Sequence, residues 1–84
     1  MPQVLINARV SNKNKYSYLD DAVIKEMCKK LEDEFHGEGR VLIRPSGTEP
    51  LVRVMVEAND LDLITVRAKE LVRVIEERIG ERIG

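Results

Sequence analysis

The stretch VLIRPSGTEPLVRVMVEA, residues 41–58, consists of two apolar runs separated by a short polar segment. Val41–Arg44 and Leu51–Ala58 are rich in β-branched residues, and apolar side chains alternate with others along the second run. This pattern is typical of half-buried strands. The segment between them holds two prolines, a glycine and three polar residues, which is the composition of a turn. The stretch therefore predicts a β-hairpin.

The residues before the hairpin predict a strand, a loop and a helix. Val4–Val10 alternates with period two, and residues 11–17 are polar. Ser17 and Asp20 fit a capping box, or Asp20 caps the following helix alone. Residues 36–40, HGEGR, end this helix with glycine. Its apolar positions follow helical spacing: Ile24, Met27, Cys28, Leu31 and Phe35.

A second, longer helix is expected to begin at Asp60. The repeat ERIGERIG closes the chain, and its last copy is expected to fray. The apolar stripe of this helix comprises Leu61, Ile64, Ala68, Leu71, Val72, Ile75 and Ile79.

Two helices with one apolar stripe each are expected to cover the same face of one small sheet. The predicted fold class is α+β, a two-layer sandwich of order β-α-β-β-α with a mainly antiparallel sheet and both helices on one face. Val52, Val54 and Val56 would face the helices, whereas Arg53 and Met55 would lie on a face left open.

The composition restricts the function. The chain has 84 residues, enough for one domain, and its 14 basic and 15 acidic residues give a net charge of −1. A neutral molecule has no overall field for nucleic acid or a membrane surface, so we expect neither as a partner. The single cysteine excludes an internal disulfide and fits a cytoplasmic location. The apolar runs are too short to span a membrane.

The hairpin loop and its flanking strands carry groups that can bind an anion. In the expected register Ile43 lies opposite Val52, and Arg44 and Arg53 become diagonal neighbours on the open face. Two guanidinium groups so placed repel each other unless an anion lies between them, and their planar donor forks suit phosphate oxygens. Gly47 permits a positive φ, which would let successive amides form an anion nest.

These features predict a phosphate-binding site formed by Arg44, Ser46, Gly47, Thr48 and Arg53. The simpler alternative is a solvated turn in which Glu49 pairs with either arginine.

Other polar residues have structural interpretations. His36 is expected to be an exposed helix end, and Cys28 a small core residue. The acidic pairs at the starts of both helices are expected to cap amides rather than to bind a metal. Asn12–Lys15 is expected to be a solvated loop.

The segment RPSGTEPLVRVMVE resembles the phosphate-binding loop in the C-terminal domain of the α-D-phosphohexomutases, and among them that of the bacterial phosphoglucosamine mutases. The resemblance extends from the first strand to the last helix. It implies that residues 1–84 form the C-terminal, TBP-like domain of a four-domain enzyme. It also implies that Arg44, Ser46, Gly47, Thr48 and Arg53 hold the substrate phosphate that is not reacting, and that Glu49 forms the turn or orients an arginine.

The same resemblance implies a mechanism and its partners. A phosphoserine in the first domain would convert a hexosamine phosphate to a 1,6-bisphosphate, with magnesium held by aspartates of the second domain. The partners would be a phosphosugar and the remaining domains, and this domain would hold no catalytic residue, metal or cofactor. The isolated 84 residues are therefore expected to be inactive. The alternatives are the same domain of a phosphomannomutase/phosphoglucomutase, or a stand-alone module that binds phosphate or the RNA backbone.

Overall fold

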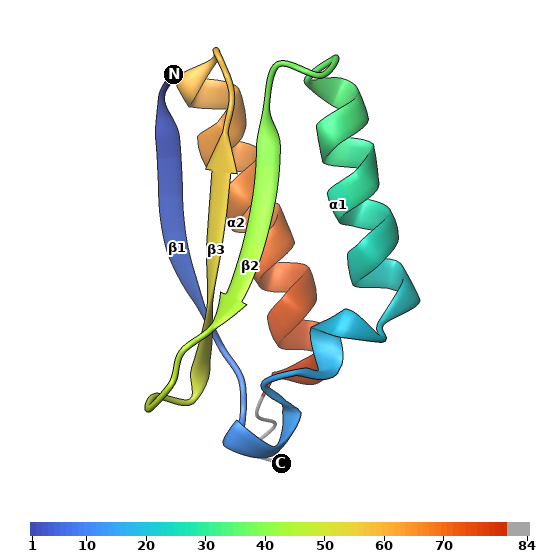
Figure 1. Ribbon diagram of the computed structural model, residues 1–84, viewed down its shortest axis with the longest axis vertical. Helices are drawn as coiled ribbons and strands as arrows, with labels where there is room; N and C mark the ends of the chain where they lie inside the picture. Colours follow the sequence, from blue (N-terminus) through green and yellow to red (C-terminus); the bar gives the residue numbers. More distant parts are fainter. Residues whose placement is uncertain (81–84) are drawn as a thin grey trace.

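The computed structural model describes residues 1–80. Its sheet has the strand order β1-β3-β2, and both neighbouring pairs are antiparallel. Two short 3-10 helices separate the first strand from the first α-helix (Figure 1). The elements are β1 (Gln3–Arg9), η1 (Asn12–Asn14), η2 (Ser17–Leu19), α1 (Ala22–Glu34), β2 (Arg40–Pro45), β3 (Leu51–Glu57) and α2 (Leu61–Ile79).

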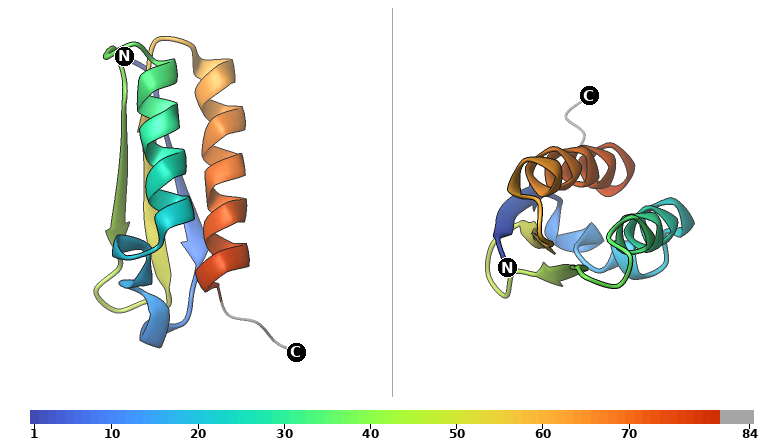
Figure 2. Two further views of the ribbon diagram at one scale, coloured as in Figure 1. Left: turned by 90° about the vertical axis from the view of Figure 1, so that its right-hand side faces the viewer. Right: turned by 90° about the horizontal axis from the view of Figure 1, so that it is seen from above.

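Both helices lie on one face of the sheet, as Figure 2 shows in two orthogonal views. Helix α2 packs against β1 and β3, while α1 packs against β2 and α2. This is the two-layer α+β arrangement expected from the helix stripes and the strand alternation. The opposite face of the sheet is covered by no described element.

The strands alternate as predicted, but the register of the β2–β3 hairpin differs from the prediction. Ile43 lies opposite Val54 rather than Val52, and Arg44 lies directly opposite Arg53 rather than diagonal to it. A shift of two residues keeps every side chain on its predicted face. The hydrogen bonding of the turn fits the observed register: the amide of Ser46 donates to the carbonyl of Leu51 at 3.0 Å, next to the pair formed by Pro45 and Val52.

Helix α1 begins one residue later than predicted. Its N-cap is Asp21, whose carboxylate accepts hydrogen bonds from the amides of Val23 and Ile24 at 3.0 and 3.1 Å. The capping box between Ser17 and Asp20 was therefore wrong, because both residues belong to the 3-10 turn η2, in which the Asp20 amide donates to the Ser17 carbonyl.

Asp21 also joins the start of α1 to the end of α2. Arg78 Nε lies 2.8 Å from both carboxylate oxygens. Partial burial by itself raises the pKa of Asp21, but Arg78 and the two capped amides outweigh it, so the pKa lies below its ordinary value.

We expect Asp21→Ala to lower the free energy of unfolding by about 0.5–2 kcal/mol, because the cap and the ion pair are lost together. Asp21→Asn keeps a capping oxygen and removes the charge. A depressed pKa in the folded state stabilises the fold above the pKa of the unfolded chain, and this contribution disappears as the pH falls through the folded pKa. Urea unfolding at pH 7 and pH 3 should therefore show a stability difference between wild type and Asp21→Asn that shrinks at the lower pH. A constant difference would contradict the ion pair.

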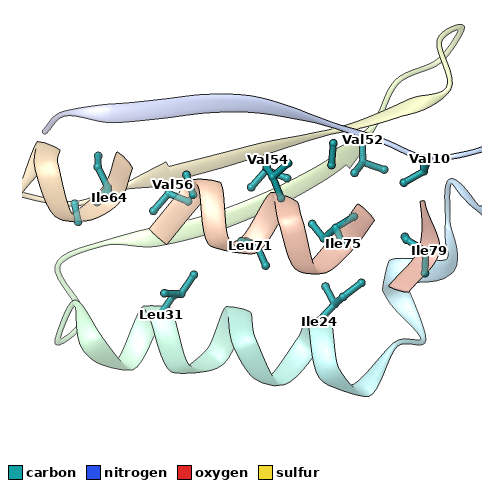
Figure 3. Packing of buried hydrophobic residues seen from close by; sticks show 14 of the residues in the cluster. Val10, Ile24, Leu31, Val52, Val54, Val56, Ile64, Leu71, Ile75 and Ile79 are labelled. Atoms are coloured by element: carbon teal, nitrogen blue, oxygen red, sulfur yellow. The ribbon is translucent and has the colours of Figure 1, made fainter. Parts of the chain in front are cut away.

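The core lies between the helices and the covered face of the sheet (Figure 3). Most residues of the predicted stripes are buried, but Met27 and Cys28 of α1 are only partly buried, and Leu61, at the start of α2, is 52% exposed. Leu61 belongs to the first turn, which extends past the end of the core, and the partly buried Leu63 packs there instead. The fully buried large side chains are Ile24, Ile64, Leu71, Ile75, Val10, Val52, Val54 and Val56.

Helix α1 ends at Glu34 with Phe35 as its C-cap, and His36 and Gly37 follow in left-handed conformation with φ of 52° and 78°. The glycine stop was correct, and His36 is exposed as expected. The last copy of the ERIG repeat, residues 81–84, which was expected to fray, lies outside the described residues. No helix in residues 1–80 is long and apolar enough to cross a membrane.

Candidate functional site

The open face of the sheet is hollowed near the hairpin loop. The hollow has a volume of about 290 Å³ and is lined by Leu5, Leu42, Arg44, Arg53 and Met55. Alternation along the three strands places these side chains opposite the core, since the core residues occupy the intervening positions. An apolar floor carrying two cations can accept an anionic ligand with an apolar or ring-shaped body.

Arg44 and Arg53 dominate the charge of this hollow. They are direct cross-strand partners, and both are exposed. No carboxylate within residues 1–80 forms an ion pair with either of them. The simpler interpretation, in which Glu49 neutralises an arginine, is therefore not what the structure shows. Like charges directly opposite each other are unfavourable, so an anion placed between them would be stabilised by both.

A third arginine provides a contrast on the same face. Arg40 begins β2, four residues before Arg44, and its Nε lies 3.3 Å from Glu57 on β3. Arg40, at the far end of this face, is thus neutralised, whereas Arg44, Arg53 and the exposed Arg9 of β1, which lie toward the loop, form no side-chain ion pair within residues 1–80. The uncompensated positive charge is confined to the end of the sheet next to the loop.

The loop is braced by Ser46. Its hydroxyl oxygen accepts the amide of Glu49 at 3.2 Å, three residues later, as an N-cap serine does. Ser46 is 7% exposed, so its side chain is mainly a brace of the turn. The carbonyl of Glu49 accepts the amide of Leu51 at 2.8 Å, which makes Glu49 a turn former through its backbone.

Gly47 does not adopt the positive φ that was expected. The anion nest built on a left-handed glycine was therefore wrong, and the turn is held instead by the hydrogen bond from the Glu49 amide to the Ser46 hydroxyl oxygen. The amides of Gly47 and Thr48 nevertheless have no hydrogen-bond acceptor among the described residues, and both residues are exposed. Open space surrounds the Gly47 Cα, where an added Cβ would meet no atom within 4 Å.

Lys15 is a residue of this site that the sequence analysis missed. It was expected to be solvated, but it is only 6% exposed, and its Nζ donates to the Ser46 carbonyl at 2.7 Å. Thus a buried cation contacts the loop from the side of the η1–η2 segment. The spacing of the lysines does not indicate this contact, since the two partners are 31 residues apart.

A second hollow of about 290 Å³ lies between α1 and β2, but it is less suited to an anion. The backbone groups of β2 there are already bonded: the Val41 amide donates to Glu32, and the Ile43 carbonyl accepts the Tyr18 hydroxyl at 3.2 Å. Burial, with a smaller contribution from the charge of Glu32, raises the pKa of the Cys28 thiol in its wall to about 11. Cys28 is thus a protonated packing residue at neutral pH.

No group of three or more His, Cys, Asp or Glu side chains in the described part of the chain could hold a metal ion. The acidic residues Asp21 and Asp60 cap helix amides, as their positions at helix starts indicated. The chemistry available at this site is therefore the binding of an anion by guanidinium groups and amides.

Comparison with known proteins defines the class. Residues 5–74 match the family described as phosphoglucomutase/phosphomannomutase, C-terminal domain. The chain belongs to this family, which confirms its resemblance to the α-D-phosphohexomutases.

Within this family, three similar curated proteins are named phosphoglucosamine mutases. The chain is 77% identical over 80 residues to a phosphoglucosamine mutase of Ruminiclostridium cellulolyticum and 72% identical over 80 residues to one of Acetivibrio thermocellus. Each match covers 95% of this chain and 18% of the relative. A third, from Thermoanaerobacter sp., is 62% identical over 79 residues. The chain thus spans less than a fifth of the length of these relatives.

The fold recurs in a solved structure of Aspergillus fumigatus N-acetylphosphoglucosamine mutase. The TM-score is 0.77 at 20% sequence identity, and the match covers 96% of this chain and 16% of that chain. This similarity supports the fold, including the placement of both helices on one face of the sheet.

Proposed function

We propose that this chain is the C-terminal domain of a phosphoglucosamine mutase, in which it binds the phosphate of the substrate that is not reacting. The observation that carries the proposal is the pair Arg44 and Arg53, directly opposite each other on the open face without a carboxylate partner. The names of the relatives support glucosamine phosphate as the substrate rather than mannose or glucose phosphate. The free thiol of Cys28 suits a cytoplasmic enzyme.

Five residues have distinct roles in the proposed phosphate site. Arg44 and Arg53 would donate charge-assisted hydrogen bonds to the phosphate oxygens, while Gly47 and Thr48 would donate their free amides. The Thr48 hydroxyl would add a neutral hydrogen bond. Ser46 would act chiefly by bracing the turn, and its hydroxyl hydrogen remains available for donation because the oxygen accepts the Glu49 amide.

Such a site suits a mutase that interconverts glucosamine 6-phosphate and glucosamine 1-phosphate through a 1,6-bisphosphate. The distal phosphate lies at C6 in one half of the reaction and at C1 in the other, so the site must recognise phosphate rather than the sugar around it. Binding energy gained there orients the reacting end of the sugar. The phosphoserine and the magnesium site, which supplies charge neutralisation during transfer, would belong to other domains of the longer protein.

Amide chemical shifts of the 84-residue chain, recorded during titration, test the proposal. Glucosamine 6-phosphate and inorganic phosphate should shift the Gly47 and Thr48 amides in a saturable way, and glucosamine should not. Strong shifts with a short RNA but none with the sugar phosphate would favour an RNA-backbone module. Equal response to mannose 6-phosphate would leave the phosphate site in place and remove the support for glucosamine.

Gly47→Ala tests how the loop meets its ligand. Because an added Cβ has open space and φ is not positive, the melting temperature should stay within about 2 °C of wild type. The methyl group would, however, stand where the ligand approaches the backbone, so phosphate affinity should fall several-fold. An unchanged affinity would show that the ligand does not approach the loop at Gly47.

A further inference from the structure

Lys15 differs from every other lysine in residues 1–80 because it is buried. Lys and Arg are rarely buried without a partner, since an ammonium loses its hydration there. Asn12, Lys13 and Tyr16 in the same segment are exposed and Asn14 is only partly buried, so Lys15 is the buried side chain of this segment. Its partner is a backbone carbonyl of the loop, at 2.7 Å, and no carboxylate of the described chain is within ion-pair distance.

The hydrogen bond from Lys15 to the Ser46 carbonyl also sets the direction of the Gly47 N–H. The carbonyl of Ser46 and the amide of Gly47 belong to one peptide unit, which is trans and planar. In a trans unit the C=O and N–H bonds point in opposite directions. Lys15 holds the carbonyl toward the protein interior, so the Gly47 N–H points the other way, toward the exposed side of the loop.

The positive charge of Lys15 also favours anion binding by the Gly47 amide. A cation bonded to a carbonyl polarises its peptide unit and makes the amide of that unit a stronger donor. The ammonium is also screened less than a surface charge because it is buried. The Gly47 amide, which is without an acceptor among the described residues, receives both effects.

We propose that Lys15 is a positioning residue of the phosphate site: it fixes the Ser46–Gly47 peptide so that the Gly47 N–H faces the bound phosphate, and it adds an uncompensated buried charge behind the loop. This rests on the proposed function, since it assigns Lys15 to the same ligand. Lys15 itself does not touch the phosphate.

Lys15→Met in the 84-residue chain removes the ammonium and keeps a side chain of similar length. The matched control is Lys13→Met, which makes the same change at an exposed lysine two residues away. Lys15→Arg restores a cation and a donor. Titration with inorganic phosphate is followed by amide shifts, and thermal unfolding is measured alongside.

We expect Lys15→Met to keep a dispersed spectrum and a melting temperature at or above that of wild type, while the Kd for phosphate rises at least fivefold. The Gly47 amide should shift even without phosphate. Lys13→Met should leave Kd within twofold, and Lys15→Arg should recover part of the loss.

Two results would overturn the inference. One is an unchanged Kd in Lys15→Met when Arg44→Ala does weaken binding, because the phosphate site would then stand without Lys15. The other is a collapsed spectrum for Lys15→Met, which would make Lys15 a residue of the fold. If the wild-type chain does not bind phosphate at all, the proposed function fails first, and the two failures are thereby distinguished.

Discussion

Replacing Arg44 or Arg53 by alanine in the phosphoglucosamine mutase that we propose contains this chain is expected to lower kcat/KM for glucosamine 6-phosphate ten- to hundredfold. Each side chain would contribute a charge-assisted hydrogen bond worth about 1.5–3 kcal/mol. Thr48→Val should cost less, about 0.5–1.5 kcal/mol, because its hydroxyl is neutral. Steady-state kinetics with the bisphosphate activator and magnesium present would give these values.

Arg40→Ala is the matched control for both arginines. It removes a guanidinium from the same face, but one already paired with Glu57 at the far end of β2. Its kcat/KM should stay within about twofold of wild type. A similar loss in all three variants would mean that the face acts through its overall charge, and not through a phosphate site beside the loop.

The double variant Arg44→Ala/Arg53→Ala should show coupling. The two residues are cross-strand partners and would share one phosphate, so their effects should not add as those of independent sites do. The stability of either single variant should not fall, since both side chains are exposed and their mutual repulsion is relieved.

Leu71→Ala is expected to lower the free energy of unfolding by about 2–5 kcal/mol. Leu71 is fully buried at the centre of α2, on the side of that helix that faces α1 within the core (Figure 3). A domain of this size has a modest core, so such a loss should leave a large fraction of the chain unfolded at 37 °C.

Val66→Ala supplies the comparison on the same helix. Val66 is 51% exposed, and its truncation should change the stability by no more than about 0.5 kcal/mol. Urea unfolding measures both variants. Equal effects for Leu71 and Val66 would contradict the orientation of α2 on the sheet.

The layers of the fold could be predicted because they depend on local periodicity. The alternation in Leu51–Ala58 and the stripe around Leu71 each specify which side is buried, whatever the neighbouring strand does. The hairpin register depends on how the loop closes. The Ser46 cap and the Ser46–Leu51 hydrogen bond accompany the observed register, two residues from the predicted one, and composition alone does not reveal either contact.

The same distinction applies to the site. Arg44 and Arg53 could be placed on one face from strand parity, but their direct opposition required the true register. Gly47 suggested a left-handed turn, yet glycine only permits that conformation. Lys15 could not be found because its contact with Ser46 joins segments far apart in the sequence, and its neighbours are all polar. The helix start at Asp21 was missed because two adjacent aspartates offer equivalent caps.

The central claim is that two opposed arginines and the loop amides form one phosphate site. The most direct test is a phosphate titration of the 84-residue chain and of its Arg44→Ala/Arg53→Ala variant, following the Gly47 and Thr48 amides. We predict saturable shifts of both amides in the wild type and none in the double variant over the same concentrations. Saturable shifts with the same midpoint in both proteins would contradict the claim.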